Sequence, residues 1–312
     1  MRARVDKLQA MTAFVRVVES GSFSAVAREL NATQSAISKQ VAALEADLGA
    51  RLLTRTTRSL ALTEEGERYF EHARRLVAEL AEAESVVRSG EQELTGWLRV
   101  AASVGYGRMR VMPLVQSFLA KHGRVRVDLR LSDGFVDLIE QGIDIAVRLG
   151  DLPDSSLVAR QIATTPRWLV AHRDYLRRLP KGRKAPRTPE DLLLHNCIVY
   201  TEVPWRRAWK FTAGAGAAEP IGSARTVQVQ GNLQTNSSEV IRFAVLAGMG
   251  IGFSPGWLFE EELASGAVQH LLPDWEAATI PIQLVSPPER RRSAKVKAFA
   301  EHLTQALASA RL

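Results

Sequence analysis

The feature that most constrains this chain lies between residues 22 and 66, where two short helical patterns precede a basic hairpin and the start of a longer helix. In the second pattern, Thr33 stands where an N-cap hydroxyl can accept an otherwise unpaired backbone N–H. The apolar residues that follow recur at steps of four, three and four: Ile37, Val41, Leu44 and Leu48. This spacing puts them on one face of an α-helix and predicts a helix over residues 33–48.

The opposite face of this helix carries only small or polar side chains and one cation: Gln34, Ser35, Ser38, Lys39 and Ala42. A surface of this kind can lie in the major groove of DNA and donate hydrogen bonds to bases and phosphates. An ordinary amphipathic surface helix would show the same pattern, so the helix alone does not decide between the two interpretations.

The neighbouring segments favour DNA binding. A short helical pattern comes first, and Asn31 follows it at a corner where a helix-turn-helix commonly needs a positive φ. After the C′ glycine Gly49, basic residues alternate with Leu, Thr and Ser in a two-stranded wing. A helix-turn-helix followed by a basic wing is a duplex-binding arrangement. The residues predicted to contact DNA are Thr33, Gln34, Ser35, Ser38, Lys39, Arg55 and Arg58.

A longer helix follows, with Thr63 at its N-cap. Its apolar residues form a heptad seam with charged neighbours: Tyr69, Ala73, Leu76, Leu80, Ala83 and Val87. One interpretation packs this seam on its own domain. The preferred one pairs two copies of the chain, because the helix joins two domains and its other faces are polar. Two-fold pairing would present two recognition helices to an approximately palindromic site.

Residues 89–96 lose the heptad pattern and are the expected hinge before a second domain. That domain begins with an expected strand at 97–103, a helix at 107–121, a strand at 125–131, a short helix at 135–142 and a strand at 143–149. This alternation predicts a parallel, doubly wound α/β unit. Crossing strands at 157–162 and 167–171 would lead to a second lobe. A strand at 281–286 and a helix at 294–309 would close the chain.

Composition excludes several other classes. The net charge of +7 favours an anionic partner only weakly. Cys197 is the single cysteine, so neither a disulfide framework nor a cysteine-based metal site is expected. The six histidines are scattered, without an HExxH or GxSxG motif, so neither an enzyme nor a cofactor is expected. The chain has no signal-like start and no apolar run of about 20 residues, so we expect a cytoplasmic protein.

Residues 6–66 resemble the N-terminal domain of LysR-type transcriptional regulators, in one ordered run without gaps (LQAMTAFVRVVESGSFSAVARELNATQSAISKQVAALEADLGARLLTRTTRSLALTEEG). The rest of the chain has the length and segment order of that family's effector domain. The resemblance implies a winged helix-turn-helix at 1–62, a linker and dimerisation helix at 63–90, and an α/β effector domain at 91–312. This last domain should resemble a type 2 periplasmic binding protein, with one lobe at about 97–165 and 266–312 and the other at about 166–265.

The same resemblance implies a ligand cleft between the lobes. Ser103 is carried over from the family as a cleft residue, and Ser132, Thr201 and Asn236 with less support. Arg148 could pair with an effector carboxylate, although solvent or a protein carboxylate is the commoner partner. The expected partners are double-stranded DNA, an unidentified small-molecule effector, further copies of the chain in a homodimer or homotetramer, and RNA polymerase.

Two other classes were weighed against a regulator. A solute-binding or transport protein is disfavoured by the missing signal peptide and by the basic wing. It would bind ligand from residue 95 onward while the whole chain showed no affinity for DNA. An enzyme would need an acid–base or nucleophile constellation, and the sequence offers none.

Overall fold

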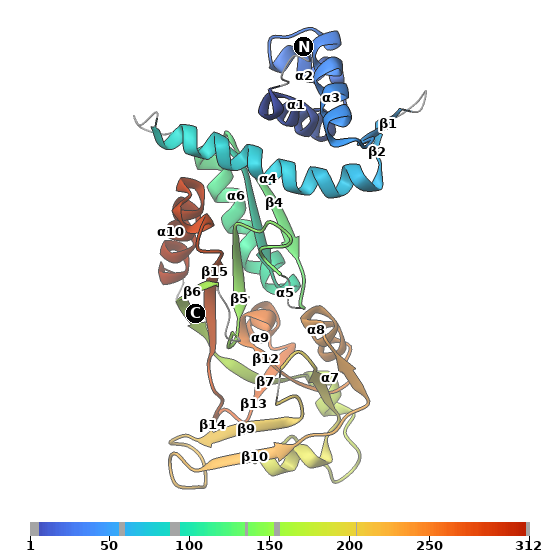
Figure 1. Ribbon diagram of the computed structural model, residues 1–312. Helices are drawn as coiled ribbons and strands as arrows, with labels where there is room; N and C mark the ends of the chain where they lie inside the picture. The colour runs from blue at the N-terminus through green and yellow to red at the C-terminus, as the bar shows by residue number, and fades with distance from the viewer. Residues whose placement is uncertain are drawn as a thin grey trace. The chain divides into compact units, whose positions relative to one another are not determined.

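The computed structural model describes residues 6–55, 60–87, 94–134, 137–152, 157–203 and 205–309 (Figure 1). The chain divides into two compact units, Met1–Gly96 and Trp97–Leu312. Each unit has its own hydrophobic core, so each is described by itself.

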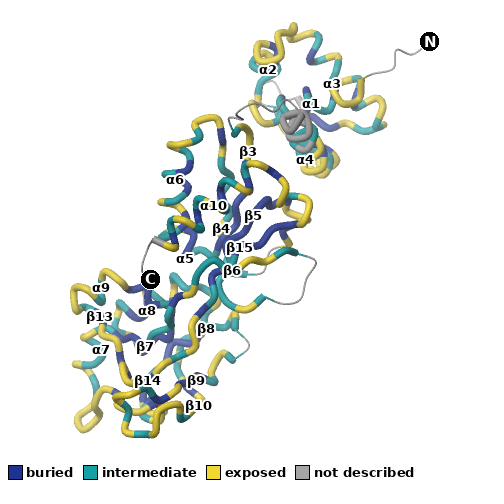
Figure 2. Tube along the Cα trace, turned by 90° about the vertical axis from the view of Figure 1, so that its left-hand side faces the viewer, coloured by how far each residue is buried: buried dark blue, intermediate teal, exposed yellow. Residues whose placement is uncertain are grey.

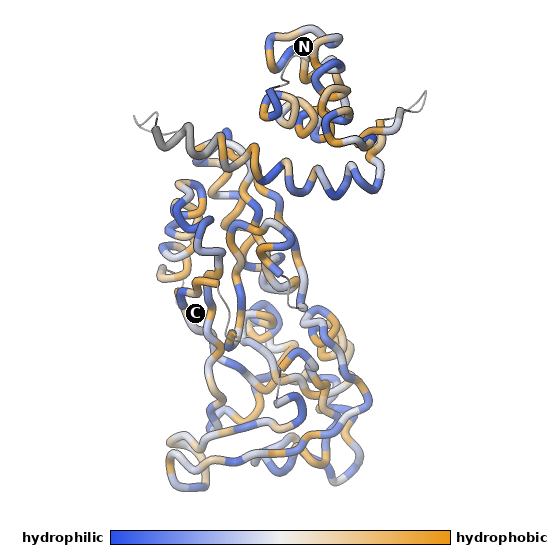
Figure 3. Tube along the Cα trace, viewed as in Figure 1, coloured by the Kyte–Doolittle hydropathy of each residue, from blue (hydrophilic) through white to orange (hydrophobic). Residues whose placement is uncertain are grey.

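The first unit is helical apart from one small hairpin. Its elements are α1 (Lys7–Ser20), α2 (Phe23–Glu29), α3 (Gln34–Leu48), β1 (Leu53–Arg55), β2 (Leu60–Leu62) and α4 (Glu64–Val87). Strands β1 and β2 are antiparallel, with Leu53 opposite Leu62. Phe14 and Val17 of α1, Ile37 and Leu44 of α3 and Ala73 of α4 are buried in one core. Figure 3 shows hydrophilic residues along much of the first half of α4.

The local signals read from the sequence are present in this unit. The Thr33 hydroxyl accepts a hydrogen bond from the Ala36 N–H at 3.1 Å and caps α3. Asn31 has the expected positive φ of 50° at the corner between α2 and α3. Gly49 ends α3 with a φ of 67°. These three residues fix where α3 begins and ends, and the spacing of its apolar residues decides which face is buried.

The first lobe of the second unit is built on a five-stranded sheet of order β4-β3-β5-β15-β6. Its elements are β3 (Gly96–Ala102), α5 (Val104–Tyr106), a π-helical turn (Gly107–Val111), α6 (Met112–Lys121), β4 (Val125–Leu131), β5 (Ile145–Leu149), β6 (Val158–Thr165), β15 (Ile280–Ser286), a 3₁₀ turn (Arg290–Arg292) and α10 (Ala294–Ser309). The rings of Phe118 in α6 and Phe299 in α10 pack 5.1 Å apart. Figure 2 shows the central strands as the buried interior of this lobe.

The second lobe combines a five-stranded sheet of order β11-β8-β12-β7-β13 with a three-stranded sheet of order β10-β9-β14. Its elements are β7 (Arg167–His172), α7 (Arg173–Arg177), a 3₁₀ turn (Pro189–Leu194), β8 (Cys197–Tyr200), β9 (Ala208–Ala213), β10 (Ala224–Gln228), β11 (Leu233–Thr235), α8 (Ser238–Leu246), β12 (Ile251–Pro255), a 3₁₀ turn (Gly256–Phe259), α9 (Glu260–Ala264), β13 (Val268–Leu271) and β14 (Trp275–Glu276). Trp209, Phe211 and Phe253 lie in the core of this lobe.

Strands β13 and β14 correct the expected lobe boundary. Because β13 pairs with β7 and β14 pairs with β9, the segment from 268 to 276 belongs to the second lobe. The chain returns to the first lobe between β14 and β15, and not near residue 266. These strands are short, and a two- to four-residue strand leaves little periodicity to recognise.

The first lobe contains the expected parallel pair and adds an antiparallel strand to it. Strands β3 and β5 are parallel, but β15 runs antiparallel to both β5 and β6. The short helix expected at 135–142 is only a turn in its described part, which ends at Gly142 with a φ of 61°. The helix expected at 107–121 begins earlier, at Val104, and contains the π-helical turn.

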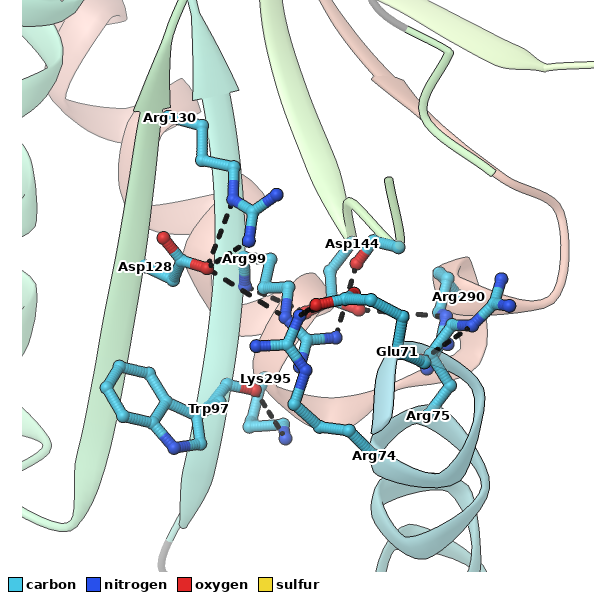
Figure 4. Close-up of polar contacts among 11 residues, drawn as sticks. Glu71, Arg74, Arg75, Trp97, Arg99, Asp128, Arg130, Asp144, Arg290 and Lys295 are labelled. Carbon is cyan, nitrogen blue, oxygen red and sulfur yellow. Dashed lines mark hydrogen bonds and ion pairs between the residues drawn. The ribbon is translucent and has the colours of Figure 1, made fainter. Parts of the chain in front are cut away.

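One face of the first lobe's sheet carries a buried charge network (Figure 4). Arg99 is only 4% exposed. Its Nε lies 4.0 Å from Asp128 Oδ2, and its backbone N–H donates to Asp144 Oδ2 at 2.8 Å. Arg290 lies 3.7 Å from the other oxygen of Asp144. Buried charges need such partners, because removal from water is costly for an unpaired ion.

Candidate DNA-binding face and effector cleft

The exposed face of α3 carries the residues that the sequence predicted for DNA binding. Ile37, Val41 and Leu44 are at most 3% exposed and Leu48 is half-buried, so most of the apolar face of α3 packs in the core. On the other side Thr33, Gln34, Ser35 and Lys39 are exposed and Ser38 is half-buried. The helix therefore presents several hydrogen-bond donors and one cation to solvent, and no large apolar side chain among these five positions.

A hollow of about 580 Å³ lies between α3 and the wing. Ser38, Ala42 and Glu45 line it from α3, and Arg51 and Thr54 line it from the segment that leads into β1 and from β1 itself. The recognition helix and the wing thus border one continuous concave surface, as a module that contacts a rounded duplex requires.

Glu45 holds the start of the wing in place. This role of Glu45 was not recognised in the sequence. One carboxylate oxygen of Glu45 accepts hydrogen bonds from the backbone N–H groups of Leu52 and Leu53, at 2.8 and 3.0 Å. On the other side, the Thr63 hydroxyl donates to the Arg51 carbonyl at 2.6 Å and accepts the Gly66 N–H. These bonds fix the wing against both α3 and α4. In the sequence Glu45 is only one of the acidic residues of the first domain, with no local motif to single it out.

The two wing arginines are placed unequally. Arg55 is the last residue of β1, opposite Leu60 of β2, and its side chain is outside the described part of the structure. Arg58 lies outside the described residues. Their contact with DNA remains a prediction.

The seam of α4 divides into two parts. Ala73 is 1% exposed and lies in the core of its own unit, and Tyr69 packs there with its ring 5.7 Å from that of Phe14. These two positions follow the alternative in which the seam packs on its own domain. Leu76 is 51% exposed and Leu80 is half-buried. The side chains of Ala83 and Val87 lie outside the described part of the structure.

In the second unit, the predicted effector residues directly follow the carboxyl ends of strands in both lobes. The first lobe contributes the carboxyl ends of β3 and β4, followed by Ser103 and Ser132. The second lobe contributes the carboxyl ends of β8 and β11, which are parallel neighbours followed by Thr201 and Asn236. The Thr201 N–H donates to the Thr235 carbonyl at 2.9 Å, so these two predicted residues lie at one edge. Ligands of α/β sheets commonly bind beyond such carboxyl ends.

A cavity of about 160 Å³ brings together two predicted effector residues, Ser132 and Arg148. The other residues that line it are Ala101, Ala102, Arg130, Leu131 and Gln141. Ser103, Thr201 and Asn236 do not belong to this lining. The cavity therefore brings together two of the five predicted effector residues.

Arg148 does not pair with Asp144, although residues 144 and 148 lie on the same side of an extended chain. Its guanidinium donates to the Gly134 carbonyl at 3.2 Å, and burial lowers its pKa. Asp144 is engaged with Arg99 and Arg290 instead. Arg148 is thus held at the cavity wall by a backbone oxygen.

Several contacts join the lobes on the α5 side. The Asp133 carboxylate accepts the Val104 N–H at 2.9 Å in the first lobe and the Ser238 N–H at 3.3 Å in the second. Arg108 lies 3.1 Å from Glu239, and Arg110 pairs with Glu260. The rings of Tyr106 and Trp257 meet edge to face at 5.1 Å. We call these four contacts the interlobe latch. Asp133 was not recognised in the sequence, because its two partners lie far apart in the chain.

The described residues offer neither a metal-binding cluster nor a membrane-spanning helix. Among the described residues no group of three or more His, Cys, Asp or Glu side chains is arranged to hold a metal ion. No helix within the described ranges has the length and apolar character to span a bilayer. Cys197 is fully buried, and burial raises the pKa of its thiol to about 12, as expected for a structural cysteine.

Known proteins resemble the whole chain. Residues 8–67 match the family of bacterial regulatory helix-turn-helix proteins of the lysR family, and residues 91–308 match the LysR substrate binding domain. The transcriptional regulator PtxR of Pseudomonas aeruginosa is 35% identical over 302 residues, which cover 96% of this chain and 93% of PtxR. The probable regulator LtrA of Klebsiella pneumoniae is 35% identical over 272 residues, 87% of this chain and 84% of LtrA.

Solved structures agree with these relatives. CrgA, a LysR-type transcriptional regulator from Neisseria meningitidis, superposes with a TM-score of 0.60 at 32% identity, over 96% of this chain and 99% of CrgA. AphB, the Vibrio cholerae virulence activator, gives a TM-score of 0.57 at 27% identity, over 96% and 98%. The chain therefore belongs to the LysR family of DNA-binding transcriptional regulators, with an N-terminal helix-turn-helix domain and a C-terminal effector-binding domain.

Proposed function

We propose that this regulator binds a pseudo-palindromic promoter site as a homodimer or homotetramer, and that a small molecule in the effector domain changes how it regulates transcription. The observation that carries the DNA-binding half is the division of α3 into a largely buried apolar face and an exposed face with Gln34, Ser35 and Lys39. Bases would be read by the amide and hydroxyl groups. Lys39 and the wing residues Arg55 and Arg58 would contact phosphates.

Electrophoretic mobility shift with DNA from upstream of the gene and its neighbours tests this assignment. Lys39→Ala and Arg55→Ala should each weaken binding and lower the slope of log K against log salt by about one. Lys210→Ala, which removes an exposed cation in the second unit, is the matched control. If both variants retard DNA as the wild type does at every salt concentration, the assignment is wrong.

Self-association is proposed to use the outer part of α4. Leu76 supports this, because it lies on the heptad seam and is 51% exposed, so its side chain is available to pack against a second helix. Leu76→Glu should shift the protein towards monomers in sedimentation velocity. Leu193→Glu, at a leucine 57% exposed in the second lobe, should leave the mass unchanged. A Leu76→Glu protein of unaltered mass would place the interface elsewhere.

The effector is proposed to bind at the cleft edges that carry Ser103, Ser132, Arg148, Thr201 and Asn236. The cavity of about 160 Å³ beside Ser132 and Arg148 supports this, because it is large enough to receive part of a small organic molecule. A thermal-shift screen of small acids and aromatic compounds tests it, since a bound ligand stabilises the folded state by mass action. RNA polymerase is a further proposed partner of the DNA-bound form.

A further inference from the structure

Arg167 is an arginine at the cleft edge of the second lobe, held in place by aromatic rings. It is the first residue of β7, directly after the crossing from the first lobe, and lies opposite Pro255 at the carboxyl end of β12. Its guanidinium lies 4.2 Å from the centre of the Trp205 ring and 5.4 Å from that of Phe253. Trp205 and Phe253 themselves meet edge to face at 6.1 Å. The rings come from separate segments of the chain, so this arrangement cannot be recognised from local sequence patterns.

Arg167 is half-buried, and partial burial removes some of the water around its guanidinium. This burial lowers the pKa of Arg167 to about 10, while Asp151 of the first lobe raises it. Within the described ranges no hydrogen-bond acceptor or carboxylate is within bonding distance of this guanidinium. Stacking on aromatic faces offsets part of the lost hydration, but it satisfies none of the five N–H donors. A partly desolvated guanidinium with free donors favours an anion that can accept several of them.

The other cleft arginines are already occupied. Arg148 donates to the Gly134 carbonyl at 3.2 Å. Arg130 donates to Asp128 at 3.1 Å, and Arg108 pairs with Glu239 at the same distance. Arg167 therefore differs from them in having its cation oriented by rings and its donors unused by the described residues. Asp151 lies two residues beyond the carboxyl end of β5 in the first lobe, and its negative charge acts on Arg167 by raising the pKa of the guanidinium.

We propose that Arg167 binds the carboxylate of the effector, so that the effector of this regulator is a small organic acid. This inference rests on the proposed effector-binding function and adds its ligand class. Trp205 and Phe253 fix the plane of the guanidinium, so that two parallel N–H groups meet the two carboxylate oxygens. Asp151 repels the same carboxylate and keeps affinity below what Arg167 alone would give.

The experiment measures binding of benzoate, succinate and 2-oxoglutarate to the full-length protein by thermal shift and calorimetry, each at up to about 10 mM. Benzamide and succinamide are the matched neutral probes. At least one acid should stabilise the wild type, and its amide should not. Arg167→Gln should weaken that acid by about 10- to 100-fold, and Arg167→Lys by less, because lysine keeps the charge but loses the two-pronged bond.

Two further variants separate ligand binding from a merely structural role. Arg177→Gln removes an arginine that is 71% exposed on α7 of the same lobe, and should bind the acid as the wild type does. Asp151→Asn should bind the acid more tightly, because it removes the opposing charge. If Arg167 served only to pair with Asp151, Asp151→Asn would not tighten binding. The unliganded melting temperature and circular dichroism of each variant verify that it is folded.

The proposal is overturned if Arg167→Gln binds the acid with the wild-type Kd, if amides bind as well as acids, or if none of the three acids stabilises the wild type. An amide or other neutral compound that binds and alters DNA retardation would leave the effector function standing and reject only the acid. Absence of DNA retardation by the wild type would instead reject the proposed function, whatever the acids do.

Discussion

The α3 face and the cleft edge place their functional side chains in opposite ways. On α3 the exposed residues come from one segment, 33–39, and are oriented by a single cap and a single buried stripe. At the cleft edge, Arg167, Trp205 and Phe253 come from three separate segments and meet only in the folded lobe. A surface built on one helix inherits its geometry from local periodicity, whereas a cleft depends on the whole arrangement of strands.

The largest loss of stability and DNA binding is expected at Gly66, where α4 lies against the backbone at the start of the wing. A Cβ atom on Gly66 of α4 would lie 2.0 Å from the Leu52 carbonyl oxygen, so Gly66→Ala must push α4 away from the wing. We expect a loss of roughly 2–3 kcal/mol in the stability of the first unit, with much weaker DNA binding. Urea denaturation and mobility shift measure both. Gly123→Ala is the control, because a Cβ there meets nothing within 4 Å.

A substitution at Glu45 tests whether the DNA-binding surface depends on α3 alone or also on a wing that is held in place. Glu45→Ala removes the acceptor of the Leu52 and Leu53 N–H groups and should cost about 1.5–3 kcal/mol. The wing should lose its position, so DNA affinity should fall although Glu45 is proposed to contact no DNA. Asp47→Asn, at a side chain 52% exposed on the same helix, should cost less than about 0.5 kcal/mol. Equal DNA affinity for Glu45→Ala and the wild type would mean that α3 binds without a fixed wing.

Asp133 tests the long-range character of the cleft. Asp133→Asn should cost about 1 kcal/mol and expose the Val104 and Ser238 amides together to hydrogen exchange. Asp137→Asn is matched, because Asp137 also accepts two backbone N–H groups, from Ile139 and Glu140, but within one turn. Exchange that rises at Val104 alone after Asp133→Asn would show that this carboxylate does not join the lobes.

The smallest effect is expected at Arg108 and Glu239. The pair joins the lobes, but the side chains are 54% and 31% exposed, so a double-mutant cycle with alanine should give a coupling of at most about 1 kcal/mol. The coupling should fall as salt is added, since exposed charges are screened. A coupling well above this value that is insensitive to salt would make the pair a main support of the interlobe latch.

The strands and helices were predictable in proportion to their length and pattern. Strands β3, β4 and β15 each span seven residues and were expected close to their observed bounds. The two-residue strand β14 and the four-residue β13 were missed, and the lobe boundary with them. A short strand is stabilised by its neighbour in the sheet, and that neighbour cannot be read from the strand itself.

The site residues follow the same division. Ser132 was expected from the family resemblance and Arg148 from its position in a strand beside the expected cleft, and both line one cavity. No local pattern connects Arg167 with Trp205, or Asp133 with Ser238, because more than 30 residues separate each pair. Tyr69 and Ala73 were expected to face a second copy, but the first unit buries them against its own Phe14 core.

The sequence by itself determined the recognition helix: its cap at Thr33, its turn at Asn31, its end at Gly49 and its buried face. The cap, the corner and the end each depend on residues within about one helical turn, and the buried face follows from apolar residues spaced along this one helix. Short-range sterics, hydrogen bonding and periodicity are therefore sufficient. Tertiary structure alone decided the antiparallel return of β15, the hold of Glu45 on the wing and the rings around Arg167. Those contacts exist only after distant segments pack together, and their partners are selected by burial and strand pairing instead of spacing along the chain.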